Sequence, residues 1–150
     1  GGDEVVRFGK AARELMDAYR NLAPFADVQP ALMALREYKL VILSNGSPEI
    51  LQAVVRNAGI EQHFAAVLSV HPLRKFKPHP AVYQSALDAL NVSKQQVAFV
   101  SSNYWDICGA GHFGYRTYWI NRAGVKPDDL GYLPDKILTG LGQLPEALKG

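Results

Sequence analysis

The fold is decided by a stretch in the first third of the chain, Leu40-Val41-Ile42-Leu43-Ser44-Asn45-Gly46-Ser47-Pro48-Glu49. The uninterrupted apolar run at 40–43 is typical of a strand that is buried on both faces of a parallel sheet. Residues 44–46 predict a turn, and Ser47-Pro48 predicts a helix start, with serine as N-cap and proline at the first helical position. Gly59 is expected to end that helix. The stretch therefore predicts a strand–turn–helix unit.

The same alternation continues on both sides of this unit. Further strands are expected at 64–70, 97–100, 116–121 and 137–138. Helices are expected at 29–37, 80–90, 106–113 and 140–149. Strands that alternate with helices imply right-handed crossovers and a parallel sheet covered on both faces. The predicted fold class is α/β, with a Rossmann-like, three-layer parallel sheet.

The N-terminal segment differs from this pattern. Apolar residues recur at steps of three and four over residues 3–22, which predicts an amphipathic helix that Pro24 ends. We expect this helix to belong to a separate cap, so that residues 1–24 are a remnant of a helical cap and 25–150 form the α/β core.

Composition excludes several classes of protein. The 150 residues carry a net charge of +2, and 48% are apolar, which is an ordinary globular balance. The nearly balanced charge argues against nucleic acid as a partner, and no apolar run approaches the ~20 residues that span a membrane. The single cysteine, Cys108, excludes an intramolecular disulfide and is expected to be a buried small apolar residue. Without a recognisable signal peptide, the expected location is the cytoplasm.

Unusual polar residues cluster after three of the predicted strands. Ligands of open parallel sheets bind beyond the carboxyl ends of the strands. The residues expected to converge there are Ser44, Asn45, Lys77, Ser101, Asn103, Trp105 and Asp106. Hydroxyl and amide donors, an ammonium group and one carboxylate suit a small anionic ligand. They do not suit Mg²⁺, because Asp106 is the only acid in its loop; no metal or other cofactor is expected.

Each of these residues also has a purely structural interpretation. Residues 44–46 can serve only as a turn, and Lys77 can be a solvated surface residue. Asp106 can be a helix cap, a role that is compatible with a place in the site. By pattern alone, Trp105 and Tyr83 are more often core residues than pocket residues.

The motifs together resemble the L-2-haloacid dehalogenases of the haloacid dehalogenase superfamily. The resemblance begins near residues 15–25 and covers nearly the whole chain. Its most specific parts are Leu43-Ser44-Asn45-Gly46-Ser47-Pro48, Lys77-Pro78, Val82-Tyr83, Phe99-Val100-Ser101-Ser102-Asn103-Tyr104-Trp105-Asp106 and Trp119-Ile120-Asn121-Arg122. Their order and spacing match the family, as well as their composition.

The resemblance implies hydrolysis of L-2-haloalkanoic acids to 2-hydroxy acids through an aspartyl ester, without a cofactor. Ser44 and the N–H group of Asn45 would hold the substrate carboxylate. Lys77 would steady the nucleophilic carboxylate, and Tyr83 would support it by hydrogen bonding. The remaining matches would act after the third strand: Ser101 and Asp106 would position Lys77 and the hydrolytic water, while Asn103 and Trp105 would line the pocket near the halide. The implied partners are a small 2-haloalkanoate and a second copy in a homodimer.

The superfamily's first motif, Asp-x-x-x-Thr after an N-terminal strand, has no counterpart in the sequence. The resemblance thus implies a chain truncated at its N-terminus, inactive by itself, whose sheet lacks its central strand. The neighbours of that strand, 40–43 and 97–100, would then pair directly, be bridged by a second chain, or belong to part of a longer protein. Two other hypotheses are a non-catalytic, self-associating module and a Mg²⁺-dependent phosphatase of the same superfamily. The phosphatases have Gly-Asp-x-x-x-Asp where this chain has residues 101–106, so the first acid is absent here.

Overall fold

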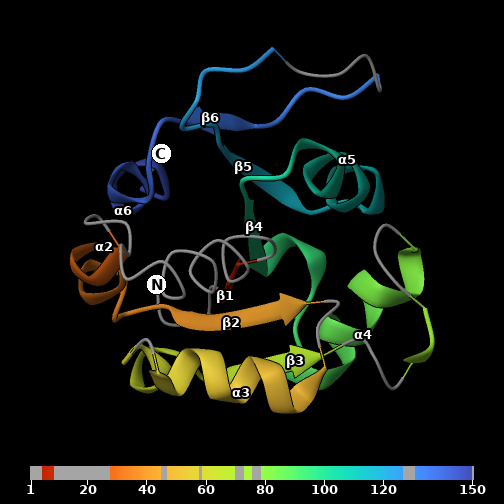
Figure 1. The fold of residues 1–150 in the computed structure, drawn as a ribbon. Helices are drawn as coiled ribbons and strands as arrows, with labels where there is room; N and C mark the ends of the chain where they lie inside the picture. Colours follow the sequence, from red (N-terminus) through yellow and green to blue (C-terminus); the bar gives the residue numbers. More distant parts are fainter. Residues whose placement is uncertain are drawn as a thin grey trace.

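A six-stranded parallel sheet forms the centre of the molecule (Figure 1). The structure, a computed structural model, describes residues 5–8, 28–44, 47–57, 59–69, 73–75, 79–126 and 131–149. The strands are β1 (Val5–Phe8), β2 (Lys39–Ser44), β3 (Ala66–Ser69), β4 (Val97–Ser101), β5 (Arg116–Ile120) and β6 (Lys136–Leu138). Their order across the sheet is β3-β2-β1-β4-β5-β6, and every neighbouring pair is parallel.

Helices cover both faces of the sheet. They are α2 (Val28–Ala34), α3 (Pro48–Asn57), α4 (Pro80–Leu90), α5 (Tyr104–Phe113) and α6 (Leu144–Ala147), with short 3-10 turns η1 (Glu61–His63), η3 (Lys94–Gln96) and η4 (Leu141–Gln143). Residues of α2, α3 and α6 pack in one apolar cluster, and residues of α4 and α5 pack in another. In Figure 1, α2 and α6 lie together on the left and α4 and α5 on the right. The predicted α/β class and three-layer architecture are confirmed.

Alternation along the strands explains why two separate clusters form. Leu40 and Ile42 of β2 pack in the α2/α6 cluster, whereas Val41 and Leu43 pack in the α4/α5 cluster. Successive side chains of a strand point to opposite faces, so a strand covered on both sides is apolar throughout. The apolar run that the sequence analysis began from is buried for this reason.

The central position of the sheet is filled, contrary to the prediction that the sheet lacks its central strand. Residues 5–8, expected within a helix over 3–22, form β1, which pairs with β2 on one side and with β4 on the other. An empty position would leave unpaired backbone groups along two buried strand edges, and a strand in that position satisfies both edges. Val5-Val6 suits a strand because β-branched residues favour extended backbone. The rest of the predicted helix, residues 3–4 and 9–22, lies outside the described residues.

Most element boundaries agree with the sequence-based expectation to within two residues. Helix α4 spans 80–90 as predicted, and α3 begins at Pro48 directly after Ser47. Helix α2 ends at Ala34, earlier than the predicted 37, and the expected tail helix over 140–149 is a 3-10 turn followed by a single helical turn. Helix α5 begins at Tyr104, two residues before the predicted start. Among the described residues, no helix is long and apolar enough to cross a membrane.

Candidate active site

The register of the sheet places Ser44 and Ser101 at the same carboxyl edge. Phe8, the last residue of β1, pairs with Ile42 of β2 and Val100 of β4. Ser44 therefore lies two residues beyond the end of β1 on one side, and Ser101 lies one residue beyond it on the other. Ser101 is fully buried, and Ser44 is half-buried. Carboxyl edges of parallel sheets are where open α/β folds bind ligands.

The turn after β4 connects Ser101 to the start of α5. The Ser101 Oγ accepts a hydrogen bond of 3.1 Å from the backbone N–H of Asn103. Asn103 is the N-cap residue of α5, and its backbone carbonyl accepts the N–H groups of Asp106 and Ile107. Asp106 therefore lies in the first turn of α5, and it is not the N-cap residue. A carboxylate in the first turn is favoured by the partial positive charge at a helix N-terminus.

A buried hydrogen bond joins Tyr83 of α4 to Asp106 of α5. The Tyr83 hydroxyl donates to Asp106 Oδ1 at 2.8 Å, and its contact with the Asp106 carbonyl oxygen is longer, 3.4 Å. Tyr83 is fully buried, and Asp106 is 2% exposed. Burial, and secondarily the adjacent Asp106 carboxylate, raise the pKa of Tyr83 far above its usual range. The phenol therefore stays protonated and acts as a donor to Asp106.

Aromatic residues hold Tyr83 in place. Its ring lies edge-on against Phe99 at 5.6 Å and against Tyr115 at 6.1 Å between centroids. The Tyr115 hydroxyl donates a hydrogen bond of 2.6 Å to the Tyr83 backbone carbonyl. Both the ring and the backbone of Tyr83 are thus fixed. The prediction that Tyr83 belongs to the core is confirmed, and its hydrogen bond to Asp106 brings two of the predicted site residues together.

Two further aromatic residues support the turn after β4, and the sequence analysis assigned them no role. Trp119 of β5 is buried, and its Nε1–H donates a hydrogen bond of 3.2 Å to the carbonyl of Ser102. The Tyr104 ring packs on Trp119 with 5.0 Å between centroids. Trp119 stood within one of the quoted motifs, so the signal was present, but only the pairing of β4 with β5 brings it to Ser102.

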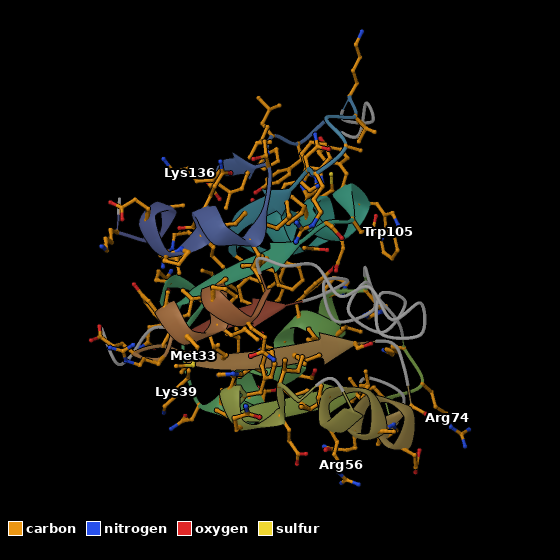
Figure 2. All side chains as sticks on the ribbon, turned by 60° about the vertical axis from the view of Figure 1, so that its left-hand side comes forward. Met33, Lys39, Arg56, Arg74, Trp105 and Lys136 are labelled. Carbon is orange, nitrogen blue, oxygen red and sulfur yellow. The ribbon has the colours of Figure 1, made fainter. Side chains whose placement is uncertain are left out.

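The other candidate residues differ in whether the structure describes them and in how far they are buried. Asn45 and Lys77 lie outside the described residues. Trp105 is 41% exposed and projects outward from the first turn of α5 (Figure 2), so its interpretation as a core residue is wrong. This follows from the helical phase, because α5 packs its neighbours Tyr104, Ile107 and Cys108 onto the sheet. Cys108 is buried, as predicted.

The described part of the chain offers no cluster of metal-binding side chains. It contains no group of three or more His, Cys, Asp or Glu side chains arranged to hold a metal ion. The spacing Asp-x-x-x-Thr occurs once in the sequence, at Asp135–Thr139. Asp135 precedes β6 and receives the backbone N–H of Thr117, near the start of β5, at 2.8 Å. This aspartate lies at the amino edge of the sheet, opposite the edge formed by Ser44 and Ser101.

Comparison with known proteins agrees with this arrangement. Residues 2–114 match the family model described as haloacid dehalogenase-like hydrolase. The chain is 46% identical over 127 residues to the haloacetate dehalogenase H-2 of Moraxella sp. (strain B), and 46% identical over 134 residues to an (S)-2-haloacid dehalogenase of Pseudomonas sp. (strain YL). These alignments cover 83% and 88% of this chain but only 57% and 58% of the relatives, so the chain spans less than two thirds of their length.

Solved structures agree with the sequence matches. An L-2-haloacid dehalogenase from Xanthobacter autotrophicus with chloropropionic acid covalently bound has a TM-score of 0.80 and 35% identity, over 85% of this chain and 61% of that one. A HAD phosphatase from Thermococcus onnurineus has a TM-score of 0.77 and 26% identity, over 91% of this chain and 64% of that one. Sequence motifs, sheet order and these matches lead to one conclusion: the chain belongs to the haloacid dehalogenase-like hydrolase family.

Proposed function

We propose that this chain serves the hydrolytic dehalogenation of L-2-haloalkanoic acids. An aspartate carboxylate attacks C2 of the substrate, the carbon–halogen bond breaks, and the halide leaves with the bonding electron pair. Water then adds to the carbonyl carbon of the aspartyl ester. Cleavage of that ester releases the 2-hydroxy acid with inverted configuration, frees one proton and restores the aspartate.

In this proposal, residues that follow the carboxyl ends of the strands bind the substrate and assist the nucleophile. Ser44 and the N–H of Asn45 bind the substrate carboxylate, and Lys77 steadies the nucleophilic carboxylate. Ser101 and Asp106 position Lys77 and the hydrolytic water, with Tyr83 donating to Asp106. These assignments follow the resemblance residue by residue, except for Tyr83, which the resemblance assigns to the nucleophilic carboxylate and whose hydroxyl donates to Asp106.

Asn103 and Trp105 complete the proposed pocket near the leaving halide. Trp105 starts from the first turn of α5 and is partly exposed, which is compatible with contact to a ligand that enters from solvent. Asn103 makes no side-chain capping hydrogen bond to α5, so its amide is not committed to the helix N-terminus.

The observation that carries the proposal is the buried Tyr83–Asp106 hydrogen bond next to the turn at residues 101–103, which has no charged side chain. A carboxylate that receives a phenol hydrogen bond and sits next to Ser101 and Asn103 is suited to orient a lysine and a water molecule. A phosphatase of this superfamily would need a second acid in the same turn, at the position of Ser102. The residue there is a serine, which favours the halide reaction over Mg²⁺-dependent phosphate chemistry.

We also propose that the 150 residues alone do not complete the reaction. Their one Asp-x-x-x-Thr spacing lies at the amino edge of the sheet, where Asp135 binds Thr117. Among the described residues, no aspartate other than Asp106 lies at the carboxyl edge, and loss of the nucleophile would remove covalent catalysis and not merely slow it.

Two measurements on the 150-residue polypeptide test these proposals. Titration with L-2-chloropropionate should perturb the resonances of Ser44 and Ser101, whereas inorganic phosphate with Mg²⁺ should not; the reverse preference would overturn the assigned substrate class. Chloride release from L-2-chloropropionate should be absent. Release that rises with polypeptide concentration would overturn the proposed inactivity, and its loss in Asp135→Asn would identify Asp135 as the nucleophile.

Self-association is a second proposal, favoured by apolar exposure near one end of the sheet. Strand β6 is an edge strand of three residues, with Ile137 55% exposed and Leu133, shortly before it, 78% exposed. Exposed apolar side chains beside an unpaired strand edge favour contact between copies. Light scattering should give a mass that rises with concentration in the native chain and less so in Ile137→Lys. A monomeric mass at all concentrations would exclude the homodimer.

A further inference from the structure

Tyr132 lies across α5 and contacts β5 as well. Its ring occupies the space next to Gly111, where a Cβ atom would lie only 2.0 Å from the Tyr132 Cζ. The ring centroid is 5.5 Å from that of His112, and the hydroxyl shares a hydrogen bond of 2.5 Å with Thr117 Oγ1. Glycine at position 111 is therefore required for Tyr132 to approach the helix this closely.

The backbone of Tyr132 is bound by a side chain from the opposite end of α5. Its carbonyl accepts a hydrogen bond from the hydroxyl of Tyr104, the first residue of the helix. Tyr104 packs on Trp119, which in turn donates to the carbonyl of Ser102. Tyr132 is thus linked, through the rings of Tyr104 and Trp119, to the turn between β4 and α5. We call Tyr132, Tyr104 and Trp119 the α5 clamp.

Residues of the proposed site lie on either side of Tyr104 in the sequence. Asn103 precedes Tyr104, Trp105 follows it, and Asp106 is one position further. A rotation of the first turn of α5 would move all three side chains together. A displacement of about 1 Å at a reacting centre can reduce a rate by roughly 100-fold.

We propose that Tyr132 is a positioning residue of the site, which acts through Tyr104 to hold the first turn of α5 in its orientation. This inference rests on the proposed function, since it is the 2-haloalkanoate that Asn103 and Trp105 are proposed to contact. The contacts of Tyr132 within the described part of the chain are with α5 and β5, and none of them is with a residue proposed to bind the substrate. Tyr132 determines where the turn that carries Asn103 and Trp105 lies.

The chain contains a direct reporter of this arrangement. It has two tryptophans, Trp105 and Trp119, one on the turn and one in the clamp. A ¹H–¹⁵N spectrum therefore shows two indole resonances, which Trp105→Phe assigns. The Trp119 indole reports its hydrogen bond to Ser102, and the Trp105 indole reports the orientation of the first turn of α5.

Four variants separate positioning from general stabilisation. Tyr132→Ala and Gly111→Ala should both shift the two indole resonances and speed solvent exchange of the Trp119 N–H, because each displaces the ring. Tyr132→Phe keeps the ring and the backbone carbonyl, so both resonances should return near their native positions. Leu133→Ala is the matched control, since Leu133 is the next residue and is 78% exposed. Urea unfolding of each variant is measured in parallel.

Ligand binding supplies the second readout. Binding of L-2-chloropropionate can be titrated by monitoring the Trp105 indole resonance. Binding should weaken roughly 2- to 10-fold in Tyr132→Ala, the size expected when the displaced turn loses one hydrogen bond to the ligand. It should be unchanged in Leu133→Ala. Unshifted indole resonances in folded Tyr132→Ala and Gly111→Ala would overturn the inference, even if both variants were less stable. If the native chain binds no L-2-chloropropionate, the proposed function fails, while the indole comparison in the absence of ligand still decides the role of Tyr132.

Discussion

The Tyr83 hydroxyl donates a 2.8 Å hydrogen bond to Asp106 Oδ1, which joins α4 to the first turn of α5. Both residues are buried, and the Tyr115 hydroxyl holds the Tyr83 backbone by a hydrogen bond to its carbonyl. A buried carboxylate needs such donors, because burial without them costs more than the hydrogen bond contributes. The pair thus serves both the stability of the fold and the proposed chemistry.

Removing the Tyr83 hydroxyl should destabilise the chain. Tyr83→Phe leaves the Asp106 carboxylate buried with one donor fewer, and we expect the free energy of unfolding to fall by about 1–3 kcal/mol. Urea denaturation measures it. Tyr38→Phe is the control, because Tyr38 is half-buried against the other face of the sheet and should change stability far less. Equal effects of the two substitutions would contradict this account of the pair.

Stability should fall at alkaline pH. The pKa of Tyr83 is raised above the usual value of about 10, so above that pH the unfolded chain loses a proton that the folded chain keeps. The stabilisation is fully present below about pH 10, and it decreases by about 1.4 kcal/mol per pH unit for each proton retained. Burial raises the pKa of Tyr132 as well. Urea unfolding of native chain and Tyr83→Phe between pH 9 and about 11 should show a shallower decline in the variant; parallel declines would refute the role of Tyr83.

Thr117 connects β5 to the segment before β6. Its Oγ1 accepts the backbone N–H of Asp135 at 3.2 Å and contacts the Tyr132 hydroxyl at 2.5 Å. Thr117→Val keeps the shape but removes both contacts, and we expect a loss of about 1–3 kcal/mol in thermal or urea unfolding. Asp88→Ala, at an exposed site on α4, should cost less than about 0.5 kcal/mol. A loss as small in Thr117→Val would mean that the contacts are not formed in solution.

Proline in β1 tests whether residues 5–8 form the central strand. Val6→Pro removes a backbone N–H and disfavours pairing in the middle of a sheet, whereas Val6→Ala keeps the N–H. Amide hydrogen exchange should therefore speed up along β2 and β4 in Val6→Pro, by roughly 10- to 100-fold. This range corresponds to a loss of about 1.4 to 2.7 kcal/mol in the free energy of opening. In Val6→Ala the exchange pattern should stay close to native. Unchanged protection in Val6→Pro would place another segment, or none, between the two strands.

Patterns among neighbouring residues determined most of the helices and strands of this protein. The buried run at 40–43, the Ser47-Pro48 helix start and the span of α4 follow from local propensities, so the structure reproduces them closely. The order of the motifs was sufficient to indicate the family. The resemblance placed Tyr83 and Asp106 in the site but did not pair them, because they are 23 residues apart and no local rule relates them.

Only the tertiary structure decided the position of β1 and the composition of the α5 clamp. Residues 5–8 have the periodicity of a helix, and only the two unpaired edges of β2 and β4 make a strand the better solution for them. No local sequence pattern pairs Tyr132 with Tyr104 or Thr117, and it acquires these partners through the pairing of β5 with β6. Local sequence determines the elements because propensity and burial pattern are properties of neighbouring residues. The contacts between them depend on which backbone and apolar groups remain unsatisfied once the sheet has formed.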